Sequence, residues 1–190
     1  HRFDFEEAAK AYESLTEDKS GLGILLSYES EVETRLDKKV VLRPINIEPK
    51  NAVVGFIGAG NYASRILIPA FKGAFAQLHT IVTSGGINGV IHGAKTGFSE
   101  ASTDVDALLA NKDINTVTIA TRHNSHAQFV QKALSAHKNV FVEKPLALTL
   151  AEVDSIEAIY NKNIETEQFS RIMVGFNRRF APQVQKMKSL

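Results

Sequence analysis

From residue 51 onward, short apolar runs alternate along the chain with segments of helical period. Five of these runs are rich in Val and Ile and are apolar at successive positions, as in strands that are buried on both faces. They lie at residues 52–58, 78–84, 116–121, 139–143 and 171–176. Strands and helices that alternate in this way predict an α/β fold with a doubly wound parallel sheet and right-handed crossovers, a Rossmann fold.

Two of the helical segments carry a start signal. Ser125 and Gln128 stand at capping-box spacing before an apolar repeat that ends near residue 137. Thr149 and Glu152 stand at the same spacing before a repeat that ends at residue 160. In a capping box the first side chain accepts from the third backbone N–H of the helix, and the third side chain accepts from the cap's own N–H. We therefore expect helices that start at Ser125 and at Thr149.

The first fifty residues have a different pattern. Residues 3–15 show a helical repeat with Asp4 and Glu7 at capping-box spacing, and the apolar run 21–28 predicts a short strand. The charged stretch that follows contains two prolines and is interpreted as a linker with one short strand at 40–43. We therefore divide the chain into a short helix–strand tail, a linker and a Rossmann domain (1–29, 30–50 and 51–190).

The first strand of the domain runs into a glycine loop, "GAGNYA". Gly58, Gly60 and Ala63 fill the three positions of the G-x-G-x-x-G/A pattern. The first glycine permits a tight turn, the second lets a diphosphate approach the backbone, and the small third residue lets the helix pack closely. The helix is expected from Asn61, with Tyr62 in its first turn, so its amides face the phosphates. The loop predicts a dinucleotide site; the alternative is a plain tight turn.

The end of the second strand bears on the choice of dinucleotide. NAD sites usually have an acidic residue there, which binds the ribose hydroxyls. This chain has Thr83, Ser84 and two glycines instead, so Ser84 is expected to border the adenosine ribose. Hydroxyls and free amides suit a 2′-phosphate, although no arginine adjoins them in the sequence. The cofactor is therefore predicted to be NAD or NADP, with a slight preference for NADP or dual use.

Polar residues also follow three other predicted strands. They are Thr121, Arg122 and His123; Glu143 and Lys144; and Asn177, Arg178 and Arg179. Because ligands of open α/β sheets bind outside the carboxyl ends of the strands, we expect these residues and the glycine loop to face one crevice.

Lys144 is the candidate catalytic residue. An ammonium group at this strand end could donate to a substrate oxygen that gains charge during hydride transfer. Glu143 would set the position and charge of the lysine, and Pro145 would fix the chain direction after the strand. The alternative is an ordinary surface pair between Glu143 and Lys144.

Composition narrows the range of functions. The 190 residues contain 22 basic and 21 acidic side chains and have a net charge of +1, which favours neither nucleic acid nor an anionic membrane as a partner. No apolar run approaches the roughly 20 residues that a membrane span needs. Cysteine is absent, which excludes disulfides and thiolate metal sites, and we predict no metal. A cytoplasmic location is expected.

Residues 52–190 resemble the N-terminal half of the Gfo/Idh/MocA oxidoreductases, the glucose–fructose oxidoreductase and inositol dehydrogenase family. The resemblance is carried by "GFIGAGNYA", "IATRHNSHAQFVQKAL", "NVFVEKPLALT" and "VGFNRRFAP", and the Glu-Lys-Pro motif is its most specific part. It implies nicotinamide-dependent hydride transfer at a sugar or cyclitol carbon, with Lys144 beside the nicotinamide. It also implies a second domain with a His general acid–base, so we expect little or no turnover from this chain alone.

The chain departs from the family at one strand end. Members often have Thr-Pro-Asn, where this chain has Thr121, Arg122 and His123. The contacts of that Asn with the nicotinamide half therefore do not carry over. His123 could contact the cofactor or bind substrate. His126 matches the family's His and could bind cofactor or be structural. Arg178 and Arg179 could bind an anionic substrate group or lie at the surface.

Residues 1–28 resemble the C-terminal tail of medium-chain, zinc-type alcohol dehydrogenases. The resemblance implies an upstream module of that kind in a bacterial bi-domain parent. The alternative is a helix and strand added to the Rossmann domain. A rival function is also open, because a fold does not fix function: a domain that senses NAD(P) without catalysis, or a scaffold.

Overall fold

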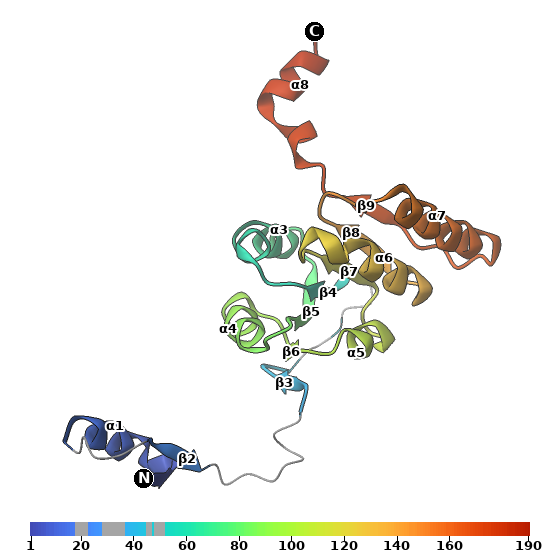
Figure 1. Cartoon of the computed structure of the whole chain (residues 1–190). Helices are drawn as coiled ribbons and strands as arrows, with labels where there is room; N and C mark the ends of the chain where they lie inside the picture. The colour runs from blue at the N-terminus through green and yellow to red at the C-terminus, as the bar shows by residue number, and fades with distance from the viewer. Residues whose placement is uncertain (18–22, 28–36, 45–46, 48–51) are drawn as a thin grey trace. The chain divides into compact units, whose positions relative to one another are not determined.

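The structure is a computed structural model. It describes residues 1–17, 23–27, 37–44, 47 and 52–190. These residues form two units, 1–37 and 38–190, which are considered separately (Figure 1). Among the described residues, no helix has the length and apolar character needed to cross a membrane.

In the first unit, strand β1 (Arg2–Asp4) pairs in parallel with β2 (Leu25–Ser27). Between them lie the short helix η1 (Phe5–Glu7) and α1 (Ala8–Glu17). The strand expected at 21–28 is confirmed by β2; residues 21, 22 and 28 lie outside the described residues. The capping box at Asp4 is wrong, because this residue ends a strand and its side chain makes no cap hydrogen bond.

The described part of residues 38–190 contains a seven-stranded sheet of order β3-β6-β5-β4-β7-β8-β9. Its strands are β3 (Lys39–Val41), β4 (Val53–Ile57), β5 (Gln77–Val82), β6 (Glu100–Ser102), β7 (Thr116–Ile119), β8 (Asn139–Val142) and β9 (Ile172–Val174). Strands β4 to β9 are parallel, and β3 pairs antiparallel with β6 at one edge. The order of the parallel strands reverses between β4 and β7, as in dinucleotide-binding folds. The predicted α/β fold is confirmed.

Helices cover both faces of the sheet. They are η2 (Ala63–Leu67), α3 (Ile68–Gly73), α4 (Ile87–Thr96), α5 (Val105–Ala110), η3 (His123–Ser125), α6 (His126–Ser135), α7 (Leu150–Glu165), η4 (Asn177–Phe180) and α8 (Pro182–Lys188). Helices α3 and α4 lie on one face, and α5, α6 and α7 lie on the other (Figure 1). This is the doubly wound arrangement that the strand pattern predicts.

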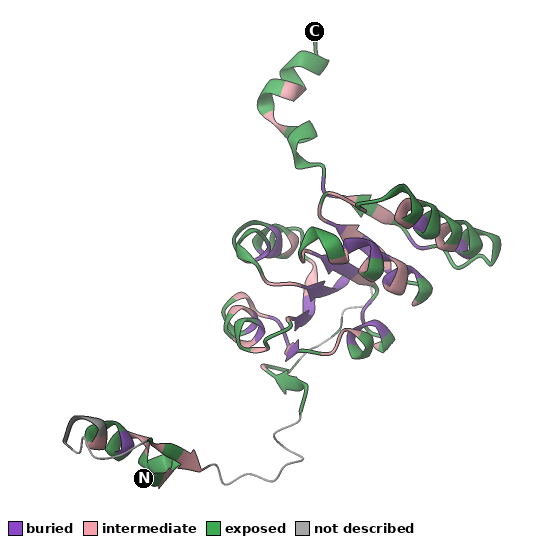
Figure 2. Cartoon of the chain, viewed as in Figure 1, coloured by how far each residue is buried: buried purple, intermediate pink, exposed green. Residues whose placement is uncertain are grey.

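The hydrophobic core lies in two layers, one on each face of the sheet (Figure 2). On the α3 side, the buried Phe56 ring contacts Phe71 and Phe98 edge-on, with ring centroids 5.4 and 5.5 Å apart. All five residues of β4 are buried. Each large apolar side chain buried in this way stabilises the fold by about 1.5–3 kcal/mol. The glycine loop therefore follows a strand that is buried along its whole length.

Of the two capping boxes predicted in the domain, one is confirmed and the other is wrong. Helix α7 has the predicted capping box: the Glu152 N–H donates to Thr149 Oγ1 at 3.2 Å, and the Glu152 carboxylate accepts from the Thr149 N–H at 3.0 Å. At α6 the predicted box is wrong, since Ser125 makes no cap hydrogen bond. Its hydroxyl donates instead to the carbonyl of Arg122, 2.9 Å away, within the η3 turn.

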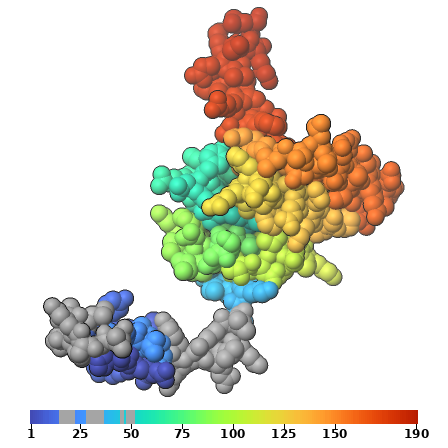
Figure 3. Space-filling view, in the orientation of Figure 1, coloured from blue at the N-terminus to red at the C-terminus, as the bar shows by residue number. Residues whose placement is uncertain are grey.

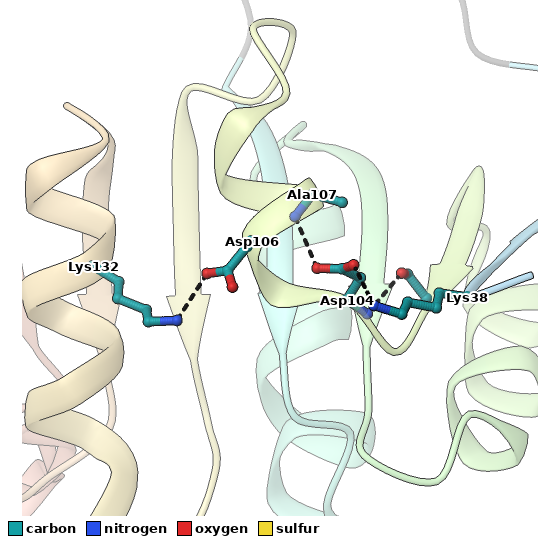
Figure 4. A network of polar contacts seen from close by, with 6 residues as sticks. Lys38, Asp104, Asp106, Ala107 and Lys132 are labelled. Carbon is teal, nitrogen blue, oxygen red and sulfur yellow. Dashed lines mark hydrogen bonds and ion pairs between the residues drawn. The ribbon is translucent and has the colours of Figure 1, made fainter.

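Strand β6 and helix α5 were not predicted, because β6 has a single apolar residue, Ala101, and the six residues of α5 are too few for a periodic pattern. Helix α5 is held by charges on three segments (Figure 4). Asp104 caps it by accepting from the Ala107 N–H at 3.0 Å, and also accepts from Lys38 at 3.2 Å. The Ala107 hydrogen bond is the main reason that the pKa of Asp104 is lowered. Lys132 of α6 pairs with Asp106 at 2.8 Å.

Candidate functional site

Two adjoining clefts lie at the carboxyl ends of the parallel strands. The large cleft has a volume of about 1030 Å³ and is bordered by segments that follow β4, β5, β6 and β7. The small cleft has a volume of about 360 Å³ and is bordered by segments that follow β4, β7, β8 and β9. Both are lined by Gly60, Ala120 and Thr121, so they are two halves of one site.

The glycine loop lies where the clefts meet. Gly58 has a φ of 101°, and a Cβ on it would lie only 2.6 Å from the Ala120 carbonyl oxygen. A Cβ on Gly60 would meet no heavy atom within 4 Å, so the backbone there faces open space. The buried Ala63 packs against the sheet. A phosphate group can therefore approach the backbone at Gly60 and the helix start at Asn61. This cradle fits the diphosphate of a dinucleotide.

Tyr62 connects the glycine loop to the far edge of the site. It lines the small cleft together with Asn61, and its hydroxyl accepts from the Asn177 side-chain amide at 3.1 Å. The helical segment that begins here and the segment after β7 lie side by side (teal and yellow in Figure 3). The small cleft is thus bordered by residues more than a hundred positions apart.

The large cleft contains almost no charge. Ser84, Thr103 and Asn88 line it on the side of β5 and β6, as does the backbone at Gly85. Of the described residues that line it, none is acidic and only Arg122 is charged. Sequence reasoning missed Thr103 because it missed β6, the strand that ends there.

Consecutive residues after β7 line different halves of the site. Thr121 borders both clefts, Arg122 borders the large one and His123 borders the small one. The hydroxyls of Thr121 and Ser125 lie 2.7 Å apart and help to close the η3 turn. Arg122, expected to be a cofactor-binding residue at this strand end, therefore lines the large cleft and not the small one.

His126 joins two strand ends. Its ring is fully buried, with Nδ1 2.7 Å from the Pro145 carbonyl oxygen and Nε2 3.2 Å from that of Thr121. The His123 ring packs edge-on against it, with centroids 5.7 Å apart. Since both acceptors are backbone carbonyls, the geometry gives His126 a positioning role between the ends of β7 and β8, although it also borders the small cleft.

Lys144 and Glu143 line the small cleft without pairing to each other. Lys144 is exposed, and its backbone N–H donates to Glu143 Oε2 at 3.3 Å. Glu143 Oε1 is buried without a hydrogen-bond partner. A Cβ on Gly175 would lie 2.7 Å from it, so the carboxylate packs against the end of β9. Within the described chain no ion pair joins these two side chains, which removes the surface-pair alternative.

Of the polar residues predicted after β9, only one lines the site. Asn177 lines the small cleft, whereas Arg178 and Arg179 are absent from the lining of both clefts. The Arg179 guanidinium lies over the Phe180 ring, 4.8 Å from its centroid. In the described parts of the chain, no group of three or more His, Asp or Glu residues is placed to hold a metal ion.

The geometry suits a long ligand in two parts with anionic groups at its middle.

Comparison with known proteins gives the chain a family that agrees with this geometry. Residues 52–169 match the Gfo/Idh/MocA family model, which is described as an oxidoreductase family with an NAD-binding Rossmann fold. An oxidoreductase from Formosa agariphila is 32% identical over 138 residues, which are 72% of this chain and 41% of that protein. The myo-inositol 2-dehydrogenase of Thermotoga maritima is 35% identical over 95 residues, 50% of this chain and 27% of that protein.

Solved structures give the same result. The scyllo-inositol dehydrogenase of Lactobacillus casei, determined with NAD(H) and scyllo-inositol bound, has a TM-score of 0.64 and 25% identity over 74% of this chain and 41% of that one. A 3-ketoreductase from Actinomadura kijaniata shares the fold, with a TM-score of 0.65 at 23% identity over 73% of this chain and 42% of that one. The chain thus spans less than half the length of these relatives. It belongs to the Gfo/Idh/MocA family of oxidoreductases and contains the family's NAD-binding Rossmann domain.

Proposed function

We propose that this chain is the cofactor-binding part of an enzyme that transfers hydride between a nicotinamide cofactor and a hydroxyl-bearing carbon of a sugar, nucleotide sugar or cyclitol. The observation that carries the proposal is the position of Lys144. It lines the small cleft together with Gly60, the glycine-loop residue through which this cleft adjoins the large one. A cation beside the reacting end of the cofactor is what alcohol oxidation requires.

Each part of the cofactor binds to a different part of the site. The backbone at Gly60 and Asn61 holds the diphosphate, because a Cβ on Gly60 would meet no heavy atom within 4 Å. The large cleft holds the adenosine half, and the small cleft holds the nicotinamide half next to His123. The nicotinamide donates or accepts the hydride, and the protein supplies orientation and charge.

In the small cleft, Lys144 donates a hydrogen bond to the reacting oxygen. Its positive charge would stabilise the oxygen while the hydroxyl proton passes to the general base, which the family resemblance assigns to a second domain, and the hydride passes from the same carbon to the nicotinamide. Glu143 holds its carboxylate beside the cleft, with Oε1 buried against the end of β9 and Oε2 accepting from the Lys144 N–H. The Tyr62–Asn177 hydrogen bond fixes the far side of the cleft, so the lysine works in a bounded space.

The relatives support the substrate class. The Thermotoga and Lactobacillus proteins are named for myo-inositol and scyllo-inositol, ring compounds that carry a hydroxyl on every carbon. We expect the 190-residue chain alone to have little or no turnover, since the family resemblance assigns the general acid–base and most substrate contacts to a second domain. Rapid turnover by the purified chain would contradict this expectation.

The proposal is tested with Lys144→Met in the longest natural protein that contains this chain. Turnover is assayed with NAD⁺ and NADP⁺ against a panel of cyclitols, sugars and nucleotide sugars. We expect kcat to fall by at least about 100-fold, the usual effect of losing a group that stabilises a developing oxyanion, while cofactor affinity changes little. Lys162→Met, on the exposed face of α7, is the matched control. Unchanged turnover in Lys144→Met would contradict the role given to Lys144. A parent protein that binds cofactor but turns over no member of the panel would favour a sensing or scaffold role.

A further inference from the structure

We propose that Arg122 makes this site prefer NADP(H) to NAD(H) by binding the 2′-phosphate of the adenosine ribose. The inference rests on the proposed function, because it takes the large cleft as the adenosine half. It goes beyond that function by assigning the cofactor preference to one side chain.

The first argument is the charge of the large cleft. An NAD site normally offers a carboxylate that accepts hydrogen bonds from both ribose hydroxyls and repels a phosphate. None of the described residues that line this cleft is acidic. A dianionic 2′-phosphate therefore meets no repulsion here, and NAD lacks its usual anchor.

The second argument is the position of the cation. Ser84 follows β5 and Arg122 follows β7, and only β4 lies between these strands in the sheet. Neighbouring strands lie about 4.8 Å apart, so the two strand ends are separated by roughly 10 Å. Both residues line the large cleft. A ribose phosphate between them lies within reach of an arginine side chain, although 38 residues separate Ser84 from Arg122 in the sequence.

The third argument is the availability of the guanidinium group. The backbone of Arg122 is fixed, because its carbonyl accepts from the Ser125 hydroxyl at 2.9 Å and from the Ser125 N–H at 3.0 Å. Its side chain is exposed, and among the described residues it makes no ion pair. A guanidinium group binds phosphate oxygens through two parallel N–H donors. The backbone of Arg122 is thus fixed, whereas its guanidinium group has no ion-pair partner among the described residues.

The diphosphate is a poorer partner for Arg122 than the 2′-phosphate. The backbone at Gly60 and Asn61 already suits the diphosphate. The 2′-phosphate would find only neutral donors on the opposite side, from Ser84, Asn88 and the backbone at Gly85. Arg122, the only cation among the described residues of the cleft wall, adds a charged partner that these neutral donors lack.

The test is calorimetric titration of the 190-residue chain and of Arg122→Gln with NADPH and NADH. We expect the parent chain to bind NADPH at least about tenfold more tightly. In Arg122→Gln the affinity for NADPH should fall by about 10- to 100-fold, as expected for a lost charged hydrogen bond, and that for NADH by less than about threefold. Arg171→Gln is the control, since Arg171 lines a separate cavity at the amino ends of β7 and β8 and should change neither affinity.

Two probes isolate the 2′-phosphate itself. The parent chain should bind 2′,5′-ADP more tightly than 5′-AMP, and Arg122→Gln should remove that difference. Ser84→Asp adds a carboxylate beside the ribose. It should lower the affinity for NADPH and leave the affinity for NADH unchanged. Circular dichroism confirms that each variant is folded.

Three results would overturn the inference. The first is a parent chain that binds NADH more tightly than NADPH. The second is an equal loss of affinity for both cofactors in Arg122→Gln, which would place the guanidinium on the diphosphate. The third is an Arg122→Gln variant that loses affinity for neither cofactor. In each of these cases the proposed function stands. If the folded parent chain binds neither cofactor, the proposed cofactor site fails and the inference fails with it.

Discussion

Gly58 and Gly60 stand two residues apart in the glycine loop but are glycine for different reasons. Gly58 has a positive φ and no room for a Cβ, which would lie 2.6 Å from the carbonyl oxygen of Ala120. At Gly60 a Cβ would meet open space. The first glycine therefore serves the fold, and the second serves the ligand.

Gly58→Ala should destabilise the protein, because it forces a non-glycine residue into the left-handed region against a backbone oxygen. A strained backbone conformation of this kind costs on the order of 1–3 kcal/mol, and the steric contact adds to it. The measurement is the free energy of unfolding in urea. Gly60→Ala is the control and should unfold within about 1 kcal/mol of the parent chain. Equal losses in both variants would show that the two positions do not differ as described.

His79 is a buried residue that makes stability depend on pH. Its Nδ1 lies 2.8 Å from the Thr80 hydroxyl, which donates in turn to Glu100 at 3.2 Å. Burial lowers the pKa of His79, and the nearby Glu100 opposes this shift only in part. The unfolded chain therefore takes up a proton at a higher pH than the folded chain does. Above the ordinary pKa of about 6.5 this residue imposes no penalty, and below it the native state loses stability.

We expect the free energy of unfolding to fall between about pH 7 and pH 5, and His79→Gln to lose part of that dependence. The measurement is urea unfolding of both proteins at several pH values, and the difference between the two curves is compared. Parallel curves would show that His79 titrates alike in the folded and unfolded states. His137, an exposed residue, provides the control substitution His137→Gln.

Among the elements, helix α7 has a start that depends on two side chains. Thr149→Ala removes the acceptor of the capping hydrogen bond and should cost about 1 kcal/mol of stability. The control is Ser155→Ala in the same helix, whose hydroxyl donates to the Ala151 carbonyl at 2.8 Å and caps nothing. Urea unfolding compares the two variants. An equal effect on stability would mean that the cap contributes nothing beyond the loss of a hydroxyl.

The elements differ in how far the sequence could predict them. Strands β4, β5, β7, β8 and β9 were expected because they are apolar at successive positions, which follows from helices on both faces. Strand β6 has only one apolar residue, and helix α5 is too short for a periodic signal. The capping boxes at Asp4 and Ser125 have the right spacing, but one residue ends a strand and the other lies in the η3 turn. Spacing alone does not reveal those competing local structures.

For the whole molecule, the predictable part of the site is the part encoded within single segments. The glycine loop and the Glu-Lys-Pro motif each lie in one stretch of sequence, so their chemistry could be inferred directly. The joint placement of Ser84 and Arg122 depends on the strand order, which brings β5 and β7 to either side of β4. The packing of Glu143 against Gly175 depends in the same way on the pairing of β8 with β9.

The resemblance of residues 1–28 to the tail of zinc-type alcohol dehydrogenases stays a prediction, as do the three-part domain division and the second domain implied by the family. The described residues that line both clefts belong to the unit 38–190. The account of cofactor binding therefore depends on this unit alone.

The most direct test of the account is calorimetric titration of the chain with NADPH and NADH, repeated on Gly60→Val. The valine side chain would project from the point where the two clefts meet, into space that is open without a ligand. The variant should therefore stay folded and lose measurable binding of both cofactors, while the parent chain binds at least one. A folded Gly60→Val that binds as the parent does, or a folded parent chain that binds neither cofactor, would contradict the assignment of this site.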